Sequence, residues 1–215
     1  MMATPHQFED LVETFGRGTK LEFQKGEFII RPGDTPPGVF YIESGLVKAY
    51  DITKYGEENL LIVRKEKEIF PLIWAITGQE RRIIYEALVP TVLRRLSRKQ
   101  FLEHLETYPE GLRIILDMTM EMYRIHSERI LNLEYRSVRE RLISFMLTMS
   151  NRFGEKTDGG IVIRVPLRRQ DIASSISASR ESTGKELTLL EKQKLISTKA
   201  LFITIHDKTK LREFL

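Results

Sequence analysis

The stretch LRRQDIASSISASRESTGKELTLLEKQKLI, residues 167–196, decides the fold of the C-terminal part of this chain. Its first residues, from Arg169 to Ala173, open a short amphipathic helix, and Ser177-Ala178-Ser179 forms a turn that ends on a good helix N-cap residue. A second helix begins at Arg180, with apolar anchors at Leu187, Leu190 and Leu195. Two short helices joined by a tight turn predict a helix-turn-helix.

The second helix of this stretch has a polar face that suits the major groove of DNA. An arginine can donate two hydrogen bonds to a guanine edge, a glutamate can accept one from a cytosine amino group, and a lysine can reach guanine or phosphate. Phosphate contacts from the serines and from the first helix would set the register. The candidate DNA-binding residues are Arg180, Glu181, Lys185, Ser179, Ser182, Arg169 and Gln170.

A solvated surface helix is the alternative interpretation, because Arg–Glu pairs are common on such helices. The residues that follow favour DNA binding. Residues 196–205 read as a β-hairpin, with Lys199-Ala200 at its turn. The order helix, turn, helix, hairpin predicts a winged helix.

Upstream of the motif, residues 109–149 carry apolar side chains at helical spacings of three and four, and the helix is expected to break near Tyr135–Ser137. Two neighbouring apolar stripes follow this helix. One stripe holds Leu112, Leu116, Tyr123, Ile130 and Leu133, and the other holds Ile115, Met118, Met122 and Ile125. A helix with two stripes can cover its own domain and pair with a partner helix, although a core helix of a monomer is the other possibility. A second helix is expected over residues 138–152, a polar loop over 153–160 and a strand over 161–165.

Residues 18–105 read instead as short strands separated by Gly and Pro turns, as in GEFIIRPGDTPPGVFYIESGLVKAY. The predicted fold class is therefore α+β, with an N-terminal β-roll, a long dimerisation helix and a C-terminal winged helix-turn-helix. The expected domains are residues 1–107, 108–137 and 138–215.

Composition narrows the classes of function. The chain has no cysteine, which excludes disulfides, thiol catalysis and cysteine-ligated clusters. Residues 161–215 hold eleven Lys and Arg against six Asp and Glu, whereas the preceding part is nearly neutral, so the excess positive charge lies at the C-terminal end. Acidic residues interrupt the first fifteen positions, which do not resemble a secretory signal, and no apolar run approaches the ~20 residues of a membrane span. We expect a cytoplasmic protein.

Three segments in the right order resemble the Crp–Fnr family of transcription regulators. ASRESTGKELTLLEKQKLI is similar to the family's recognition helix, with Arg180, Glu181 and Lys185 on the base-reading positions. The roll segment quoted above and SVRERLISFML, at the family's hinge, complete the resemblance. It implies a homodimer on a palindromic DNA site, a small-molecule effector in the roll, and contact with RNA polymerase. Lys185 stands where arginine is commoner, which keeps the charge and loses the planar fork.

The expected effector site departs from the family's cyclic-nucleotide cassette. In IFPLIWAITGQERRIIYEA, Arg81 falls on the phosphate-binding arginine, but Pro71 and Leu72 replace a glycine and a glutamate, and Arg82 and Ile83 replace a serine and an alanine. Without the acidic partner a ribose hydroxyl would be buried unpaired, at a cost of ~1–3 kcal/mol. We expect that cyclic AMP is not the effector.

The roll leaves two interpretations open. Its aromatic side chains could simply fill the module, or a different effector, aromatic or acidic, could bind beside Arg81 and Arg82. The candidate pocket residues are Arg81, Arg82, Leu72, Trp74, Tyr85, His126 and Ser127, the last two from the long helix. A DNA-binding protein with a ligand-free roll is the corresponding alternative function.

The sequence identifies no cofactor. His126 could ligate haem only with a second ligand, and the four histidines have no metal-ligand spacing. Nucleophile, P-loop and dinucleotide motifs are absent from the sequence, so no enzyme activity is expected. The charged run Arg64–Glu68 is expected to be a solvated hairpin.

Overall fold

The structure, a computed structural model, describes residues 5–215, with side chains described from Glu9 onward. The first four residues of the segment compared above with a secretory signal lie outside the described residues. The chain divides into two compact units. The first unit comprises the residues up to Ile52 together with Leu61–Tyr123, and the second comprises Thr53–Leu60 together with Arg124–Leu215. Each unit is described by itself.

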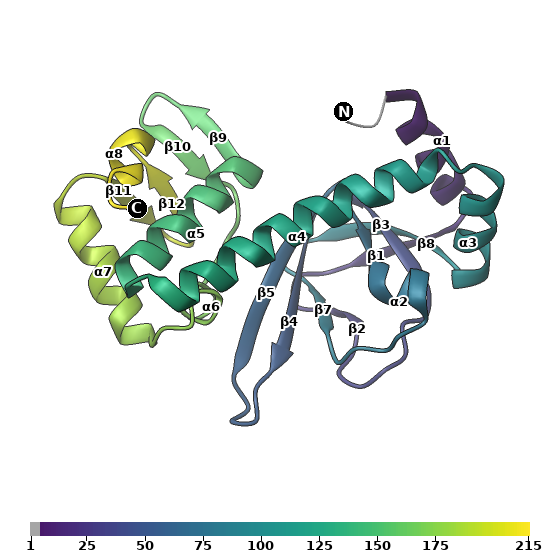
Figure 1. Ribbon diagram of the computed structural model, residues 1–215, viewed down its shortest axis with the longest axis horizontal. Coiled ribbons are helices and arrows are strands. Elements are labelled where there is room, and N and C mark those ends of the chain that lie inside the picture. The colour runs from purple at the N-terminus through teal and green to yellow at the C-terminus, as the bar shows by residue number, and fades with distance from the viewer. Residues whose placement is uncertain (1–4) are drawn as a thin grey trace. The chain divides into compact units, whose positions relative to one another are not determined.

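The first unit is a β-roll with helices at both ends of its sequence (Figure 1). Its strands form two four-stranded sheets, in the orders β1-β8-β3-β6 and β2-β7-β4-β5. The strands are β1 (Thr19–Phe23), β2 (Phe28–Ile30), β3 (Val39–Ser44), β4 (Leu46–Ile52), β5 (Glu58–Lys65, whose residues 58–60 belong to the second unit), β6 (Ile69–Phe70), β7 (Ile84–Ala87) and β8 (Thr91–Leu96). The helices are α1 (Pro5–Gly16), α2 (Leu72–Thr77), α3 (Arg98–Thr107) and the first part of α4 (Gly111–Tyr135).

Strand pairing in the roll is antiparallel and follows the turn residues of the sequence. In the first sheet Leu21 pairs with Leu93 and Phe40 with Arg95, and in the second Ala49 pairs with Tyr85. At the turn between β3 and β4, Gly45 has φ +98°, and a Cβ there would lie 2.5 Å from the Thr91 hydroxyl. Only glycine satisfies both constraints.

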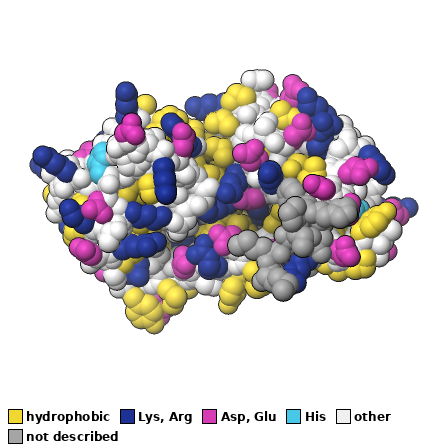
Figure 2. Space-filling model, turned by 90° about the horizontal axis from the view of Figure 1, so that it is seen from above, with side chains coloured by type: hydrophobic (Ala, Val, Ile, Leu, Met, Phe, Trp, Pro, Cys, Tyr) yellow, Lys and Arg dark blue, Asp and Glu magenta, His cyan; other side chains and the backbone are white. Residues whose placement is uncertain are grey.

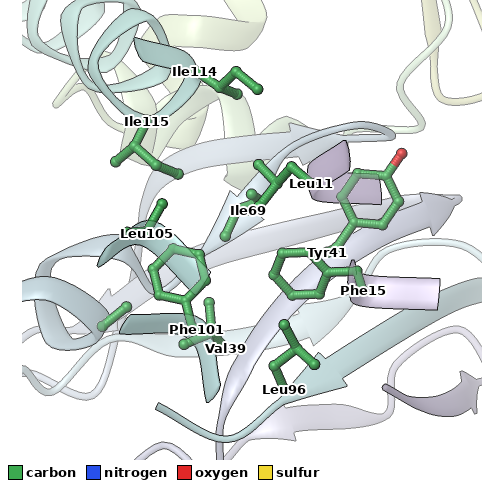
Figure 3. Packing of buried hydrophobic residues seen from close by; sticks show 11 residues of the cluster. Leu11, Phe15, Val39, Tyr41, Ile69, Leu96, Phe101, Leu105, Ile114 and Ile115 are labelled. Carbon is green, nitrogen blue, oxygen red and sulfur yellow. The ribbon is translucent and has the colours of Figure 1, made fainter. Parts of the chain in front are cut away.

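The helices of the first unit pack on one sheet through a shared apolar cluster (Figure 3). Phe15 of α1 stacks on Tyr41 of β3, with ring centroids 5.6 Å apart, and lies 6.1 Å from Phe101 of α3. Ile114 and Ile115 bring α4 to the same cluster. Side chains of this size each contribute roughly 1.5–3 kcal/mol when fully buried, so the cluster ties the three helices to the roll.

The helix α4 contributes residues to both units, and its two apolar stripes have different environments. On the second stripe, Ile115 is buried and Met118 packs against the cluster. The first stripe is exposed: Leu112 is 49 % exposed, Leu116 54 %, Tyr123 69 %, Ile130 63 % and Leu133 37 %. Figure 2 shows hydrophobic side chains reaching the surface of the molecule among charged ones. One stripe therefore packs against the apolar cluster of the first unit, and the other exposes large apolar side chains along α4.

The second unit is a helical domain with a four-stranded antiparallel sheet in the order β11-β12-β10-β9 (Figure 1). It contains the end of α4 and the helices α5 (Val138–Phe153), α6 (Arg169–Ser175), α7 (Arg180–Lys192) and α8 (Lys208–Arg212). Its strands are β9 (Gly154–Thr157), β10 (Gly160–Ile163), β11 (Ile196–Lys199) and β12 (Phe202–Ile205). Leu142, Ile143 and Met146 of α5 are fully buried in this unit.

Two helix boundaries agree with the sequence analysis. The helix α4 ends at Tyr135, and α5 begins after Ser137, whose hydroxyl accepts from the Glu140 amide in a capping box. The residues expected as a polar loop, 153–160, instead form β9 and the turn into β10. All four β9 residues are exposed and none of them is apolar except Gly154, so the strand has no apolar face, and Gly160, at φ +124°, provides the turn.

The charged run 64–68 forms the turn between β5 and β6, where Glu66 and Lys67 are exposed as expected, but the two ends of the run are not solvated. Arg64 is 9 % exposed, and its guanidinium Nη1 lies 3.4 Å from a carboxylate oxygen of Glu68, which is itself largely buried. Arg64 belongs to β5, where it is buried beside Glu68, and the charged pairing makes that burial tolerable. Among the described residues, no helix is long and apolar enough to cross a membrane.

Candidate nucleic-acid interface

The helices α6 and α7 form the helix-turn-helix. Ala178 donates its amide to the Ala173 carbonyl across the turn, at 3.0 Å, and Ser177 there has φ +49°. Ser179 caps α7: its hydroxyl accepts from the Ser182 amide at 3.0 Å. The side chains that hold the pair together are Ile172, Ala173, Ile176, Leu187 and Leu190, all buried. The motif is rigid because both its turn and its cap are satisfied by hydrogen bonds.

The exposed face of α7 and the first residue of α6 line an open groove. Its lining residues are Arg169, Arg180, Glu181, Gly184, Lys185, Thr188, Leu189 and Lys192. Four of these side chains are cationic and one is acidic, so the groove is strongly basic. Gly184 has no side chain and leaves the middle of the groove open. A Cβ there would lie 3.9 Å from the Arg169 guanidinium. A polyanion fits this surface better than a neutral ligand does.

The structure brings together four of the candidates, Arg169, Arg180, Glu181 and Lys185, in one groove. Arg180, Glu181 and Lys185 are exposed on α7, where the spacing of four and five residues puts them on adjoining turns. The other three candidates, Gln170, Ser179 and Ser182, are not among the residues that line the groove. Gln170 is half-buried, and the Ser179 and Ser182 hydroxyls are hydrogen-bonded to each other at 2.9 Å.

The sequence analysis missed three lining side chains, Thr188, Leu189 and Lys192. Their signal was available, since 181, 185, 188 and 192 follow one another at helical spacings of three and four. Thr188 donates its hydroxyl to the Gly184 carbonyl at 3.0 Å, which leaves its methyl group free for contact. The basic face of α7 is therefore about three turns long rather than two.

An ion pair and a hydrogen bond hold α7 and the hairpin of β11 and β12 in place. Arg139 of α5 donates to Glu186 of α7 at 2.8 Å. Glu191, near the end of α7, accepts from the Thr198 amide at 2.9 Å and so fixes β11 of the hairpin. Both carboxylates lie on α7 away from the groove lining, so the helix is fastened on one side and open on the other.

The start of α6 is organised by Arg168 and the buried carboxylate of Asp171. Asp171 accepts from the Arg168 backbone amide at 2.7 Å and from the guanidinium at 2.8 Å and 3.0 Å. These hydrogen bonds, opposed by desolvation, raise the pKa of the Arg168 guanidinium above its ordinary value. Arg168 is therefore a permanent cation next to Arg169 of the groove.

The candidate effector residues of the first unit have mixed environments. Arg81 and Arg82 are exposed in the segment before β7, and Leu72 and Trp74 of α2 are half-buried against the apolar cluster. Tyr85 is buried and stacks on Phe70 at 4.7 Å, and burial raises the pKa of its phenol. His126 and Ser127 lie on α4 in the second unit, both half-buried. Within residues 5–215 no group of three side chains is placed to hold a metal ion.

Comparisons with known proteins agree with this architecture. The profile for "Cyclic nucleotide-binding domain" matches residues 20–108, and that for "Crp-like helix-turn-helix domain" matches residues 140–214. A "Global nitrogen regulator" from Nostoc sp. is 30 % identical over 96 % of this chain and 91 % of its own length. A "Fumarate and nitrate reduction regulatory protein" from Vibrio cholerae is 25 % identical over 90 % of this chain and 77 % of its own length.

Solved structures share the fold. FixK2 from Bradyrhizobium japonicum has a TM-score of 0.79 at 21 % identity, over 91 % of this chain and 96 % of its own. A CooA mutant from Carboxydothermus hydrogenoformans has a TM-score of 0.78 at 19 % identity, over 94 % and 89 %. The relatives are transcription regulators and not enzymes. The roll, the long connecting helix and the basic helix-turn-helix follow one another along this chain as the two matched profiles do. The chain is a DNA-binding transcription regulator that belongs to the Crp–Fnr family.

Proposed function

We propose that this regulator binds a palindromic DNA site as a homodimer, with α7 in the major groove of each half-site. The basic groove along α7 is the observation that carries the proposal. Arg180, Glu181 and Lys185 would read base edges, because their side chains extend from the open side of the helix. Arg169, with Gln170, Ser179 and Ser182, would lie toward the phosphates and set the register.

The test is a selection of duplexes from a random pool by the wild-type protein, followed by binding of the selected and a scrambled duplex. Arg180→Ala should lose about 1–3 kcal/mol of discrimination between the two duplexes. Lys99→Ala removes an equal charge from an exposed helix position of the first unit and should keep the discrimination. Specific binding that survives Arg180→Ala would show that another residue reads the site.

Dimerisation through α4 is supported by the exposed apolar stripe. Side chains such as Leu116 and Tyr123 are more than half exposed in the single chain, which is unusual for a row of large apolar groups on one helix. Paired α4 helices would cover the row and present two recognition helices to half-sites about 34 Å apart. Leu116→Glu should shift the protein to monomer in sedimentation velocity, whereas Ile73→Glu, at an exposed position of α2, should not.

We also propose that an effector other than cyclic AMP binds the roll and changes DNA affinity. The support is the pair of exposed arginines, Arg81 and Arg82, before β7. The stack of Phe40, Phe70 and Tyr85 inside the roll favours the second candidate, a packed and ligand-free module. Thermal-shift screening separates them, because an effector must both stabilise the protein and change its affinity for the selected duplex. Contact with RNA polymerase stays a prediction from the family resemblance, and action in the cytoplasm stays a prediction from the sequence.

A further inference from the structure

A carboxylate from a distant part of the sequence is paired with the cation that adjoins the recognition surface. Glu58, at the start of β5, accepts from the Arg168 guanidinium Nη2 at 2.7 Å. Both residues belong to the second unit, and 110 positions of sequence separate them. The Arg168 side chain is 53 % exposed and the Glu58 side chain 35 %, so this is a surface pair. Arg168 immediately precedes Arg169, which lines the basic groove.

A set of hydrogen bonds around the start of β5 holds Glu58 in this position. The Leu60 amide donates to the Ser174 hydroxyl of α6 at 3.2 Å. Arg129 of α4 donates to the Leu60 carbonyl at 3.0 Å, to the Asn59 side chain at 3.1 Å and to the Ser174 carbonyl at 3.2 Å. Burial lowers the pKa of the Arg129 guanidinium, as expected for a cation that is largely removed from water. Glu58 is therefore placed against α6 by its neighbours and does not depend on its own ion pair to stay there.

We propose that Glu58 masks Arg168, and that Arg168 is a latent phosphate-contacting residue of the DNA interface. This proposal rests on the proposed DNA-binding surface of α6 and α7. Asp171 orients Arg168 through its backbone amide and guanidinium, and Glu58 takes the remaining side of the same Nη2 atom. A phosphate that approached the Nη2 atom of Arg168 would have to displace a carboxylate already in place.

The variant Glu58→Gln tests the mask. It keeps the shape of the side chain and removes the charge that competes with phosphate. Affinity should rise several-fold, equally for the selected and the scrambled duplex, because phosphate contacts are independent of sequence. One more phosphate contact should steepen the slope of log affinity against log salt by about 0.9. The loss of affinity between 50 and 200 mM salt should therefore grow by about 3.5-fold.

Two further variants make the result specific. Glu57→Gln removes the same charge from the neighbouring exposed residue and should leave the salt slope unchanged. When Glu58→Gln is combined with Arg168→Gln, the gain in DNA affinity that Glu58→Gln gives alone should disappear. A slope change that is equal in Glu57→Gln, or a gain that survives the loss of Arg168, would overturn the mask.

The failure of this proposal can be told from failure of the proposed DNA-binding surface. If wild type binds the selected duplex, loses discrimination with Arg180→Ala, and binds no more tightly as Glu58→Gln, then the surface stands and the mask falls. If neither wild type nor Glu58→Gln binds any duplex, both are wrong. Circular dichroism melting of each variant shows whether a change in affinity comes from unfolding.

Discussion

Basic side chains have opposite surroundings in the two units of this protein. In the second unit, Arg169, Arg180 and Lys185 extend from short helices into an open groove. In the first unit, Arg64 lies on a strand, 9 % exposed, against Glu68 and near the Tyr85 phenol. An exposed row on a rigid helix suits a long polyanion, while a buried cation with its own carboxylate is first of all part of the fold. The same residue type therefore has a different role in each region.

The largest expected effect comes from removing the buried cation. Arg64→Ala removes the buried cation that faces Glu68 and should lower the free energy of unfolding by about 3 kcal/mol. Arg180→Ala removes an exposed side chain and should change it by less than about 0.5 kcal/mol. Urea unfolding followed by circular dichroism measures both. Equal losses in the two variants would remove the contrast drawn between the two regions.

The Nε atom of Arg64 adds a detail to this contrast. It is buried and has no hydrogen-bond partner among the residues that the structure describes. Such an atom usually costs about 1–3 kcal/mol, so the pair with Glu68 is imperfect. An uncharged pair of similar volume, Arg64→Met with Glu68→Gln, should therefore unfold less easily than Arg64→Ala alone, which the same urea titration would reveal.

Each unit also contains a helix capped by a serine, so the loss of a cap can be compared between the two units. Ser179 caps α7 in the second unit, and Ser97 caps α3 in the first, where its hydroxyl accepts from the Gln100 amide at 3.2 Å. Ser179→Ala and Ser97→Ala should each destabilise the protein by about 1 kcal/mol. Only Ser179→Ala should weaken DNA binding, since it loosens the start of the recognition helix. Equal DNA affinities for the two variants would contradict the placement of α7 in the groove.

A smaller effect is expected at Lys185, where an arginine would add a planar fork. Lys185→Arg keeps the charge and offers two parallel donors to a guanine edge. Discrimination between the selected duplex and one changed at the contacted base pair should rise a few-fold, with little change for a scrambled duplex. Competition binding measures this ratio. A uniform rise for all duplexes would place Lys185 on phosphate.

The sequence predicted features that local chemistry determines better than features that depend on tertiary packing. The helix-turn-helix was readable because its caps, turn and apolar anchors lie within thirty residues, so local chemistry determines the local structure. The strand β9 was missed because all its side chains are exposed, and no alternation marks an edge strand of that kind. The burial of Arg64 could not be read from a charged run, since it depends on strands that the roll brings together from different parts of the chain.

The candidate site shows the same division. Arg180, Glu181 and Lys185 could be named because helical periodicity decides which side of α7 they occupy. Arg168 was left out because its importance comes from Glu58, which is 110 positions earlier in the sequence. Contacts of that separation are set by tertiary packing, and one sequence carries no local signal for them.

The smallest predicted effect concerns a buried histidine of the first unit, which has no equivalent on the recognition surface. His104 is 8 % exposed, and its Nδ1 lies 3.0 Å from the Thr14 hydroxyl. Burial lowers the pKa of its imidazole, with the charge of Asp10 acting in the opposite direction. The unfolded chain therefore binds a proton more readily than the folded one between the lowered pKa and about 6.5. The stability that neutral His104 provides is complete above that window and is lost as the pH falls through it.

In urea unfolding at a series of pH values, wild type should lose stability on acidification to pH 5 more steeply than His104→Gln does. The comparison between the two proteins cancels the carboxylates that both share. DNA affinity at pH values where both proteins stay folded should be the same for the two, because α3 belongs to the roll and not to the helix-turn-helix. Parallel stability curves for the two proteins would show that the His104 environment does not disfavour its charged form.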